Sequence, residues 1–138
     1  EGTCSSRAGK ATVYPANSVN GEYYTAMRLY RYLFYRAGID MPVVDDSTPS
    51  TGQEIRIGKT VRGGNIAVAE GKYNISVKDG NLCLAANDVK GYLSLFEYLE
   101  NTILTKAQAS LILTADYTRT ADAATMAEIA SAEAWNIL

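Results

Sequence analysis

Histidine is absent from this chain of 138 residues. Its absence removes the commonest general base and the commonest metal ligand of proteins. It also excludes Ser-His and Cys-His nucleophile pairs, since both contain histidine. The chain has only two cysteines, Cys4 and Cys83, which are too few for a thiolate zinc site. They can form a disulfide or remain two unpaired thiols. The sequence therefore predicts no metal site and no cofactor.

Basic runs and long apolar runs are also missing. Lys and Arg number 13 against 15 Asp and Glu, a net charge of -2, and the basic residues are scattered, which disfavours nucleic acid as a partner. No stretch approaches the roughly 20 apolar residues of a membrane span. A chain of this length can bury about two-thirds of its unfolded surface. We therefore expect one domain with its own core.

The first half of the sequence predicts a strand, a helix and a second strand. "KATVYP" forms a short strand that Pro15 ends, since proline cannot donate to a ladder. Apolar residues recur at helical spacing from Gly21 to Ala37, and Gly38 is the expected C-cap. After the polar connection "MPVVDDSTPSTGQ", "EIRIG" forms the second strand.

"KYNISVKDGNLCLAA" predicts a β-hairpin with Asp79 and Gly80 as a two-residue turn. A type I′ turn here sets the register, because a slip of one residue would move every apolar side chain to the other face. The expected facing pairs are Val77 with Leu82, Ile75 with Leu84, and Tyr73 with Ala86.

A second helix follows the hairpin, with Asp88 or Asn87 as its N-cap. Its expected buried stripe consists of Val89, Tyr92, Leu93, Phe96, Leu99 and Ile103. Beyond Leu104, "SLILT" suggests a strand and "DAATMAEIASAEAW" a helix capped by Asp122.

The expected fold class is α+β: a two-layer domain with a mixed or antiparallel sheet of about four strands and two helices on one face. The order is β-α-β-β-β-α, with a further helix at the C-terminus. The expected organisation is an N-terminal tail over residues 1–10, the domain over 11–104, and an extension over 105–138 that leads to a downstream domain.

Residues 54–64, "EIRIGKTVRGG", offer the one candidate phosphate loop, with Lys59, Thr60 and Arg62 as binding candidates. A Walker loop needs a glycine, then four residues, then Gly-Lys-Ser/Thr, and a helix after it. Here Gly52 is one residue too far away, and a hairpin follows. The favoured interpretation is a structural corner, in which Thr60 bonds a turn and Arg62 clips the loop to a carboxylate or a carbonyl.

Two other groups of side chains have a functional and a structural interpretation. Tyr24, Tyr32 and Tyr35 of the first helix could stack on sugars, although aromatic residues at helical spacing usually belong to the core. Asp45 and Asp46 could hold a cation, although a solvated turn is favoured because no third acidic residue is nearby.

Five segments carry a resemblance to a known family: "ATVYPANS", "AMRLYRYLFYRAGIDMPVV", "EIRIGKTVR", "GKYNISVKDGNLCLAA" and "GYLSLFEYL". In this order and spacing, over residues 11 to 104, they resemble the small α+β domain that precedes the catalytic barrel in bacterial β-N-acetylhexosaminidases and related α-glucuronidases. In those enzymes the chemistry belongs to carboxylates of the barrel, which is not part of this chain. The resemblance implies no catalytic residue to carry over.

The resemblance implies a non-catalytic accessory domain of a secreted or cell-surface carbohydrate-active protein, with an adjacent domain of the same polypeptide as its partner. A carbohydrate-binding module that uses exposed tyrosines is one alternative, and phosphate or nucleotide binding at Gly58–Arg62 is another. "EAWNIL" at residues 133–138 resembles the first strand of secreted endonuclease/exonuclease/phosphatase-type modules, so fusion to a phosphoesterase-type domain also stays open.

Overall fold

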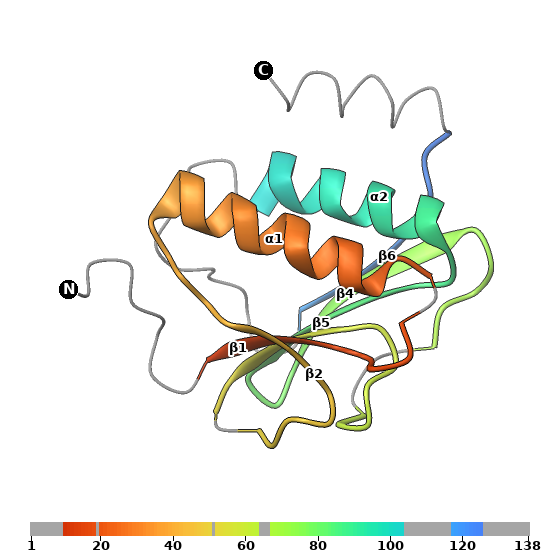
Figure 1. Cartoon of the computed structure of the whole chain (residues 1–138). Coiled ribbons are helices and arrows are strands. Elements are labelled where there is room, and N and C mark those ends of the chain that lie inside the picture. Colours follow the sequence, from red (N-terminus) through yellow and green to blue (C-terminus); the bar gives the residue numbers. More distant parts are fainter. Residues whose placement is uncertain (1–9, 19, 51, 64–66, 104–116, 126–138) are drawn as a thin grey trace.

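The computed structural model of the chain describes residues 10–18, 20–50, 52–63, 67–103 and 117–125. Figure 1 shows two layers, a sheet and a pair of helices that cover one of its faces. The strands are β1 (Ala11–Tyr14), β2 (Val43–Asp45), β3 (Glu54–Ile57), β4 (Lys72–Lys78), β5 (Asn81–Ala86) and β6 (Thr118–Asp122). The helices are α1 (Glu22–Ala37) and α2 (Val89–Tyr98), and a short π-helix, η1 (Leu99–Ile103), continues α2.

The six strands form one mixed sheet in the order β2-β1-β3-β5-β4-β6. The first four are parallel, so their carboxyl ends lie at the same edge of the sheet. β4 runs antiparallel to both of its neighbours, β5 and β6. The α+β class is as predicted, whereas the expected number of about four strands is too low.

The two unexpected strands lie at the two edges of the sheet. β2 has three residues and falls in the segment predicted to be a polar connection. β6 has the polar sequence "TRTAD" and pairs with β4 over five positions, although it belongs to the segment 105–138 that the sequence assigns to an extension. Edge strands need no apolar face of their own, so neither carries a strong alternating pattern.

Both helix termini that the sequence identifies by their capping residues are confirmed. Gly38 adopts a left-handed conformation with φ 70°, and its N–H and that of Ile39 close the end of α1 on the carbonyls of Phe34 and Leu33. Asp88 caps α2 by accepting a hydrogen bond from the Gly91 N–H.

Two details of the second helix and the C-terminal segment differ from the expectation. Val89 is exposed and Leu93 is only half-buried, although the sequence predicts both in the buried stripe, whereas Leu95 is buried. Asp122 ends β6 and is followed by non-helical residues 123–125, so it is not a helix cap. The expected strand "SLILT" and the helix beyond residue 125 lie outside the described residues.

The β4–β5 hairpin has the predicted register, with Val77 opposite Leu82, Ile75 opposite Leu84 and Tyr73 opposite Ala86. Asp79 and Gly80 both have positive φ, at 53° and 80°, as a type I′ turn requires.

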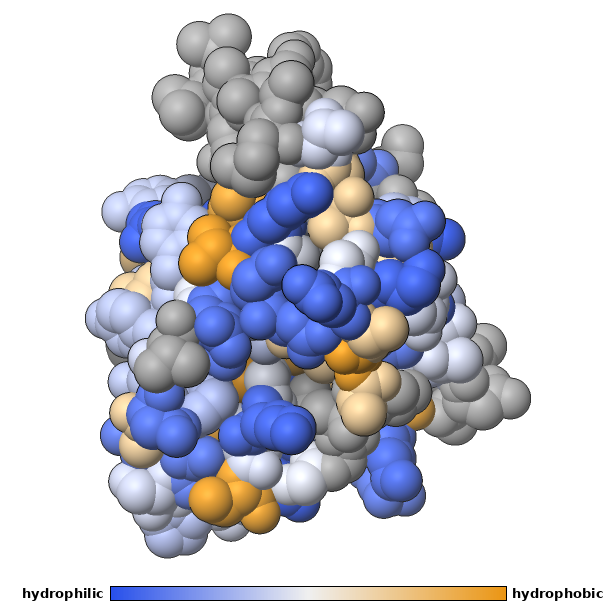
Figure 2. All heavy atoms as spheres, turned by 90° about the vertical axis from the view of Figure 1, so that its right-hand side faces the viewer, coloured by the Kyte–Doolittle hydropathy of each residue, from blue (hydrophilic) through white to orange (hydrophobic). Residues whose placement is uncertain are grey.

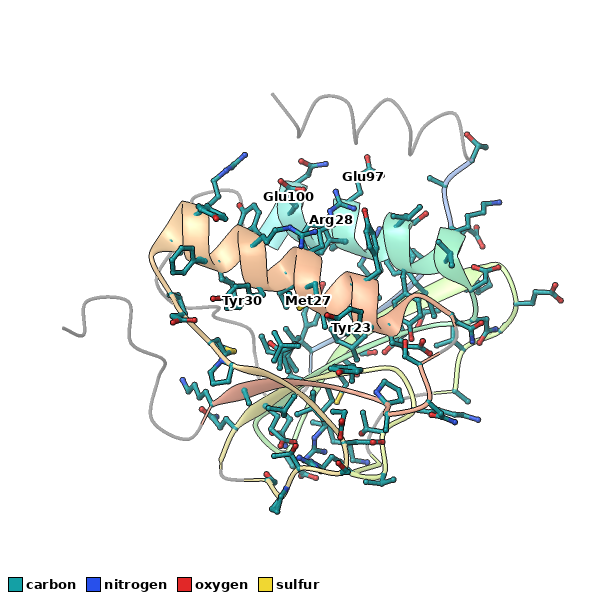
Figure 3. The ribbon with its side chains drawn as sticks, in the orientation of Figure 1. Tyr23, Met27, Arg28, Tyr30, Glu97 and Glu100 are labelled. Atoms are coloured by element: carbon teal, nitrogen blue, oxygen red, sulfur yellow. The ribbon has the colours of Figure 1, made fainter. Side chains whose placement is uncertain are left out.

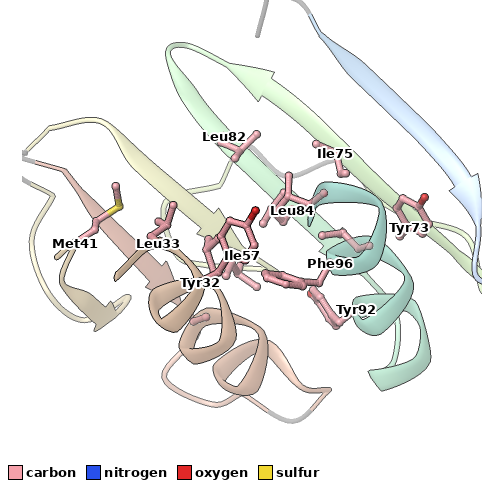
Figure 4. Packing of buried hydrophobic residues seen from close by; sticks show 14 of the residues in the cluster. Tyr32, Leu33, Met41, Ile57, Tyr73, Ile75, Leu82, Leu84, Tyr92 and Phe96 are labelled. Atoms are coloured by element: carbon pink, nitrogen blue, oxygen red, sulfur yellow. The ribbon is translucent and has the colours of Figure 1, made fainter. Parts of the chain in front are cut away.

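The hydrophobic core fills the space between the sheet and the helices, as Figure 4 shows. Tyr32 of α1 and Phe96 of α2 meet edge to face within it, with ring centroids 6.2 Å apart. Cys83 of β5 is a free, buried thiol, and burial raises its pKa. Among the described residues, no helix is long and apolar enough to span a membrane.

Candidate functional site

A pocket of about 380 Å³ lies at the edge of the sheet where β1, β3 and β5 end. The N-termini of α1 and α2 lie at the same end of the molecule, and Figure 2 shows that this face is mainly hydrophilic. In open α/β sheets, ligands bind outside the carboxyl ends of the strands. The polar part of the pocket wall consists of Asn17, Asn20, Glu22, Lys59, Asn87 and Tyr92.

Gly58 allows three elements to approach one another at the base of this pocket. It follows β3 with φ 78°, and its N–H donates to the Leu84 carbonyl at 2.7 Å. A Cβ atom at this position would lie 2.8 Å from Cγ of Glu22 and 2.9 Å from Oη of Tyr92. A glycine is therefore required both by the backbone conformation and by the space available.

Glu22 is the first residue of α1, and the surrounding chain holds its buried carboxylate in place. Its Oε1 accepts hydrogen bonds from the Ser18 hydroxyl at 3.0 Å and from the Asn20 N–H at 2.8 Å. A negative charge at a helix N-terminus is favourable because the first N–H groups point toward it. The wall of the pocket thus carries a fixed negative charge.

Tyr92 brings a hydroxyl to the same place from α2. The residue is 1% exposed, and within the described part of the chain its Oη makes no hydrogen bond of normal geometry. Burial, and to a lesser extent the Glu22 carboxylate, raises the pKa of this hydroxyl, while the nearby backbone N–H of Ala86 acts in the opposite direction. Tyr92 is therefore a neutral phenol at physiological pH.

The three residues of the candidate phosphate loop, Lys59, Thr60 and Arg62, have different surroundings in the structure. Lys59 is exposed and lines the pocket, where it makes no ion pair with any described residue. Thr60 is buried, and its N–H donates to the Gly58 carbonyl at 3.1 Å. Within the described part of the chain its hydroxyl makes no hydrogen bond, so the expected side-chain bond to a turn is not found. Only Lys59 of the three lines the pocket.

Arg62 clips the loop to the sheet, as its structural interpretation predicts. Its Nε lies 3.1 Å from both carboxylate oxygens of Glu54, and its Nη1 and Nη2 donate to the carbonyls of Asp46 and Thr48. Arg56 also donates to Glu54, at 3.0 Å. Burial raises the pKa of the Glu54 carboxyl, but the hydrogen bonds from Arg62, Arg56 and Ser50 and the charge of Arg62 together outweigh burial, so the pKa lies below its usual value.

Backbone N–H groups of this loop are directed to protein acceptors. The N–H of Gly58 binds the Leu84 carbonyl, that of Val61 binds Oδ2 of Asp46 at 3.0 Å, and that of Gly63 binds the Thr60 carbonyl. A phosphate loop works by presenting several N–H groups to the ligand. The observed geometry does not favour a phosphate or nucleotide at this position.

Of the three candidate stacking tyrosines, Tyr24 and Tyr35 are 49% and 77% exposed. Tyr32 is 8% exposed and lies in the core, so its proposed role as a stacking platform is wrong. Tyr24 and Tyr35 are eleven residues apart on α1, which is about 16 Å along the helix axis. They are too far apart to stack on one sugar ring together.

Two side chains of α1, Arg28 and Tyr23, pack against neighbouring elements of the fold. Figure 3 shows Arg28 of α1 directed toward Glu100 of η1, at 3.7 Å, and the Arg28 guanidinium lies 4.3 Å from the Phe96 ring centroid. Tyr23 packs edge to face on Tyr14, with ring centroids 5.1 Å apart. This part of the helical layer therefore consists of packing contacts.

Asp45 and Asp46 do not form a joint site. Asp45 accepts hydrogen bonds from the N–H and hydroxyl of Ser47, which lower its carboxyl pKa. Asp46 is buried, contrary to the expected solvated turn, and accepts the N–H groups of Ala16 and Val61. Across the described ranges, no group of three or more acidic, cysteine or histidine side chains could hold a metal ion.

No family model and no curated protein matches this sequence. Among solved structures, the chain is similar to the GH20 β-N-acetylhexosaminidase from Streptomyces coelicolor A3(2), with 16% identity and a TM-score of 0.49 over 81% of this chain and 22% of that one. It is also similar to a mutant β-hexosaminidase from Streptomyces plicatus, with 16% identity and a TM-score of 0.45 over 78% of this chain and 21% of that one. The chain thus spans about a fifth of each enzyme's length.

Proposed function

We propose that the chain is a non-catalytic accessory domain of a secreted, multidomain carbohydrate-active protein and that it packs against a neighbouring catalytic domain. One observation carries this proposal. The segments on which the sequence resemblance rests form a continuous substructure in the implied order, with the "EIRIG" strand β3 paired directly to strand β5 of the "YNISVKDG" hairpin.

The residues within these segments contribute to folding. Ile57 of β3 and Tyr73 and Ile75 of β4 lie in the core. Gly58 allows the close approach of α1 and α2, and Arg62 closes the loop on Glu54. The order of elements is then a requirement of the scaffold, and the chemistry belongs to the partner domain.

The test uses the longest natural polypeptide that contains this chain, the same polypeptide without it, and the isolated chain. We expect the isolated chain not to hydrolyse a chromogenic N-acetylhexosaminide. Removing the chain should lower the Tm of the remaining protein by several degrees, because a packed interface is lost. Turnover by the isolated chain, or an unchanged Tm after its removal, would contradict the proposal.

A carbohydrate-binding module is the second candidate, because Tyr24 and Tyr35 are exposed on α1. Exposed aromatic rings present an apolar face on which sugars can stack. Retention of the chain on an insoluble polysaccharide column, and its loss in a Tyr24→Ala, Tyr35→Ala double variant, would favour this function.

A further inference from the structure

We propose that the pocket at the carboxyl ends of β1, β3 and β5 binds one neutral, hydroxyl-rich ring, such as a single sugar unit. This inference concerns a site away from Tyr24 and Tyr35 and does not depend on the accessory role of the chain. The pocket of about 380 Å³ lies at the small end of the range of about 300–1,000 Å³ that small-molecule sites occupy. Its volume suits a ligand of one or two rings.

The rim of the pocket offers unused hydrogen-bonding groups of both kinds. Within the described part of the chain, the side-chain amides of Asn17 and Asn20 make no hydrogen bond, and the Lys59 ammonium has no partner. Asn87 donates through Nδ2 to the Val68 carbonyl at 2.6 Å, which fixes its side chain and leaves its Oδ1 as an acceptor. Neighbouring donors and acceptors of this kind match hydroxyl groups, each of which both donates and accepts.

The base of the pocket is closed by the Tyr92 side chain. Its hydroxyl oxygen is buried, and within the described part of the chain it makes no hydrogen bond of normal geometry. A Cβ atom at Gly58 would lie against both this hydroxyl and the Glu22 side chain, so no free space remains there. A ligand therefore lies against Tyr92, and its hydroxyl groups bind the amides and the ammonium at the rim.

The charges around the pocket disfavour other ligand classes. An anion would meet the Glu22 carboxylate, and Asp88 already caps the N-terminus of α2. A cation would meet the Lys59 ammonium and only one carboxylate of the wall. A purely apolar ligand would leave these polar groups without partners. A neutral molecule with several hydroxyl groups is the class that fits.

The experiment is a titration of the full ¹⁵N-labelled chain, followed by two-dimensional NMR, with glucose, galactose, mannose and N-acetylglucosamine as separate probes. Glycerol and inorganic phosphate serve as comparison ligands. We expect at least one sugar to give saturable shifts confined to the amides of residues 17–18, 20–22, 58–59, 67–68 and 85–92. Glycerol and phosphate should give none at the same concentration.

An Asn17→Ala, Lys59→Met double variant is expected to bind that sugar about tenfold more weakly, since two hydrogen-bonding groups are lost. Both side chains are exposed, so the variant should keep the wild-type fold and spectrum. Lys78→Met, which removes an exposed lysine at the end of the hairpin, is the matched control and should bind as the wild type does.

Four outcomes would overturn this inference: no saturable shift with any sugar, saturation by phosphate in place of sugars, shifts centred on Tyr24 and Tyr35, or full affinity in the double variant. Failure of the accessory role would appear separately, as hydrolysis by the isolated chain or as an unchanged Tm of the shortened polypeptide. The two proposals can therefore fail independently.

Discussion

Lys59 and Arg62 stand three residues apart in the same loop, yet the structure uses them in opposite ways. The Arg62 side chain is 11% exposed, with Glu54 and two backbone carbonyls as acceptors. Lys59 extends into the pocket wall without an ion pair to any residue that the structure describes. The difference lies in the carboxylates: Glu54 is turned toward Arg62, whereas Glu22 is already held by Ser18 and Asn20.

This comparison shows that two basic residues of one loop can have different roles: Arg62 (the structural half) stabilises the fold, whereas Lys59 (the pocket half) is exposed at the pocket. A guanidinium presents several donors in one plane and so can bind a carboxylate and two carbonyls at once. A lysine with no partner adds little to folding and remains available to a ligand. Substitutions in the two halves should therefore differ sharply in their effect on stability.

The largest expected effect follows from Arg62→Met. Removing one partner from a buried ion pair leaves Arg56 as the remaining described cation beside Glu54, and we expect a loss of about 3 kcal/mol in the free energy of unfolding. Urea denaturation measures the loss. Arg62→Lys should restore only a part of it, because an ammonium cannot reproduce the planar set of contacts. A loss within the range of an ordinary surface substitution would contradict the structural role of Arg62.

The next effect concerns Gly58, which directly precedes Lys59 at the base of the pocket. Gly58→Ala should cost about 2 kcal/mol, because it combines a positive φ with a clash against Glu22 and Tyr92. Gly63→Ala is the matched control: it has a similar φ of 74° but no atom within 4 Å of the added Cβ, so it should cost only about 1 kcal/mol. Equal losses in the two variants would contradict the close approach at the base of the pocket.

The pH dependence of the free energy of unfolding below neutral pH tests the interaction between Arg62 and Glu54. The pKa of Glu54 is lowered in the folded state, so this carboxylate contributes stability above its unfolded pKa of about 4.3, and that contribution is lost as the pH falls. The difference in unfolding free energy between wild type and Arg62→Met should therefore be largest near neutral pH and should shrink below about pH 4. A difference independent of pH would show that the arginine does not act through Glu54.

The pH dependence of the free energy of unfolding above neutral pH tests the burial of Tyr92 beside the pocket. The raised pKa of Tyr92 means that the folded state keeps its phenol proton where the unfolded state loses it. The protein should thus lose stability as the pH rises above about 10, the usual pKa of tyrosine. Tyr92→Phe should reduce this slope, which chemical denaturation at several pH values would measure. An unchanged slope would indicate that Tyr92 ionises freely.

Lys59→Met should have the smallest effect, a change of less than about 0.5 kcal/mol in the free energy of unfolding, as for other surface substitutions. Thermal and urea denaturation beside Arg62→Met measure it under identical conditions. A loss comparable with that of Arg62→Met would mean that Lys59 has a structural partner.

The sequence predicts those parts of the fold in which local signals agree. In the β4–β5 hairpin, the alternating apolar residues and the Asp79–Gly80 turn require the same register, and the structure has it. α1 ends at the glycine that its pattern indicates. The edge strand β2 is too short to show a pattern, and it is specified by pairing with β1 some thirty residues away.

The pocket was not predictable from the sequence, because its wall comes from separate segments of the chain, at residues 15–17, 20–22, 58–59, 67–68 and 85–92. Only the shared edge of the parallel strands brings them together. The burial of Tyr32, by contrast, had a signal. Tyr32 follows Leu29 by three positions and therefore lies on the apolar stripe of α1, while Tyr35 lies beyond that stripe.

Two double-mutant cycles measured by urea denaturation would test the division of this loop most directly. One pairs Glu54→Gln with Arg62→Met, and the other pairs Glu22→Gln with Lys59→Met. We predict a coupling energy of about 1.5–3 kcal/mol for the first pair, as for hydrogen bonds between charged groups, and a value near zero for the second. Additive effects at Glu54 and Arg62, or an equally strong coupling between Glu22 and Lys59, would contradict this account.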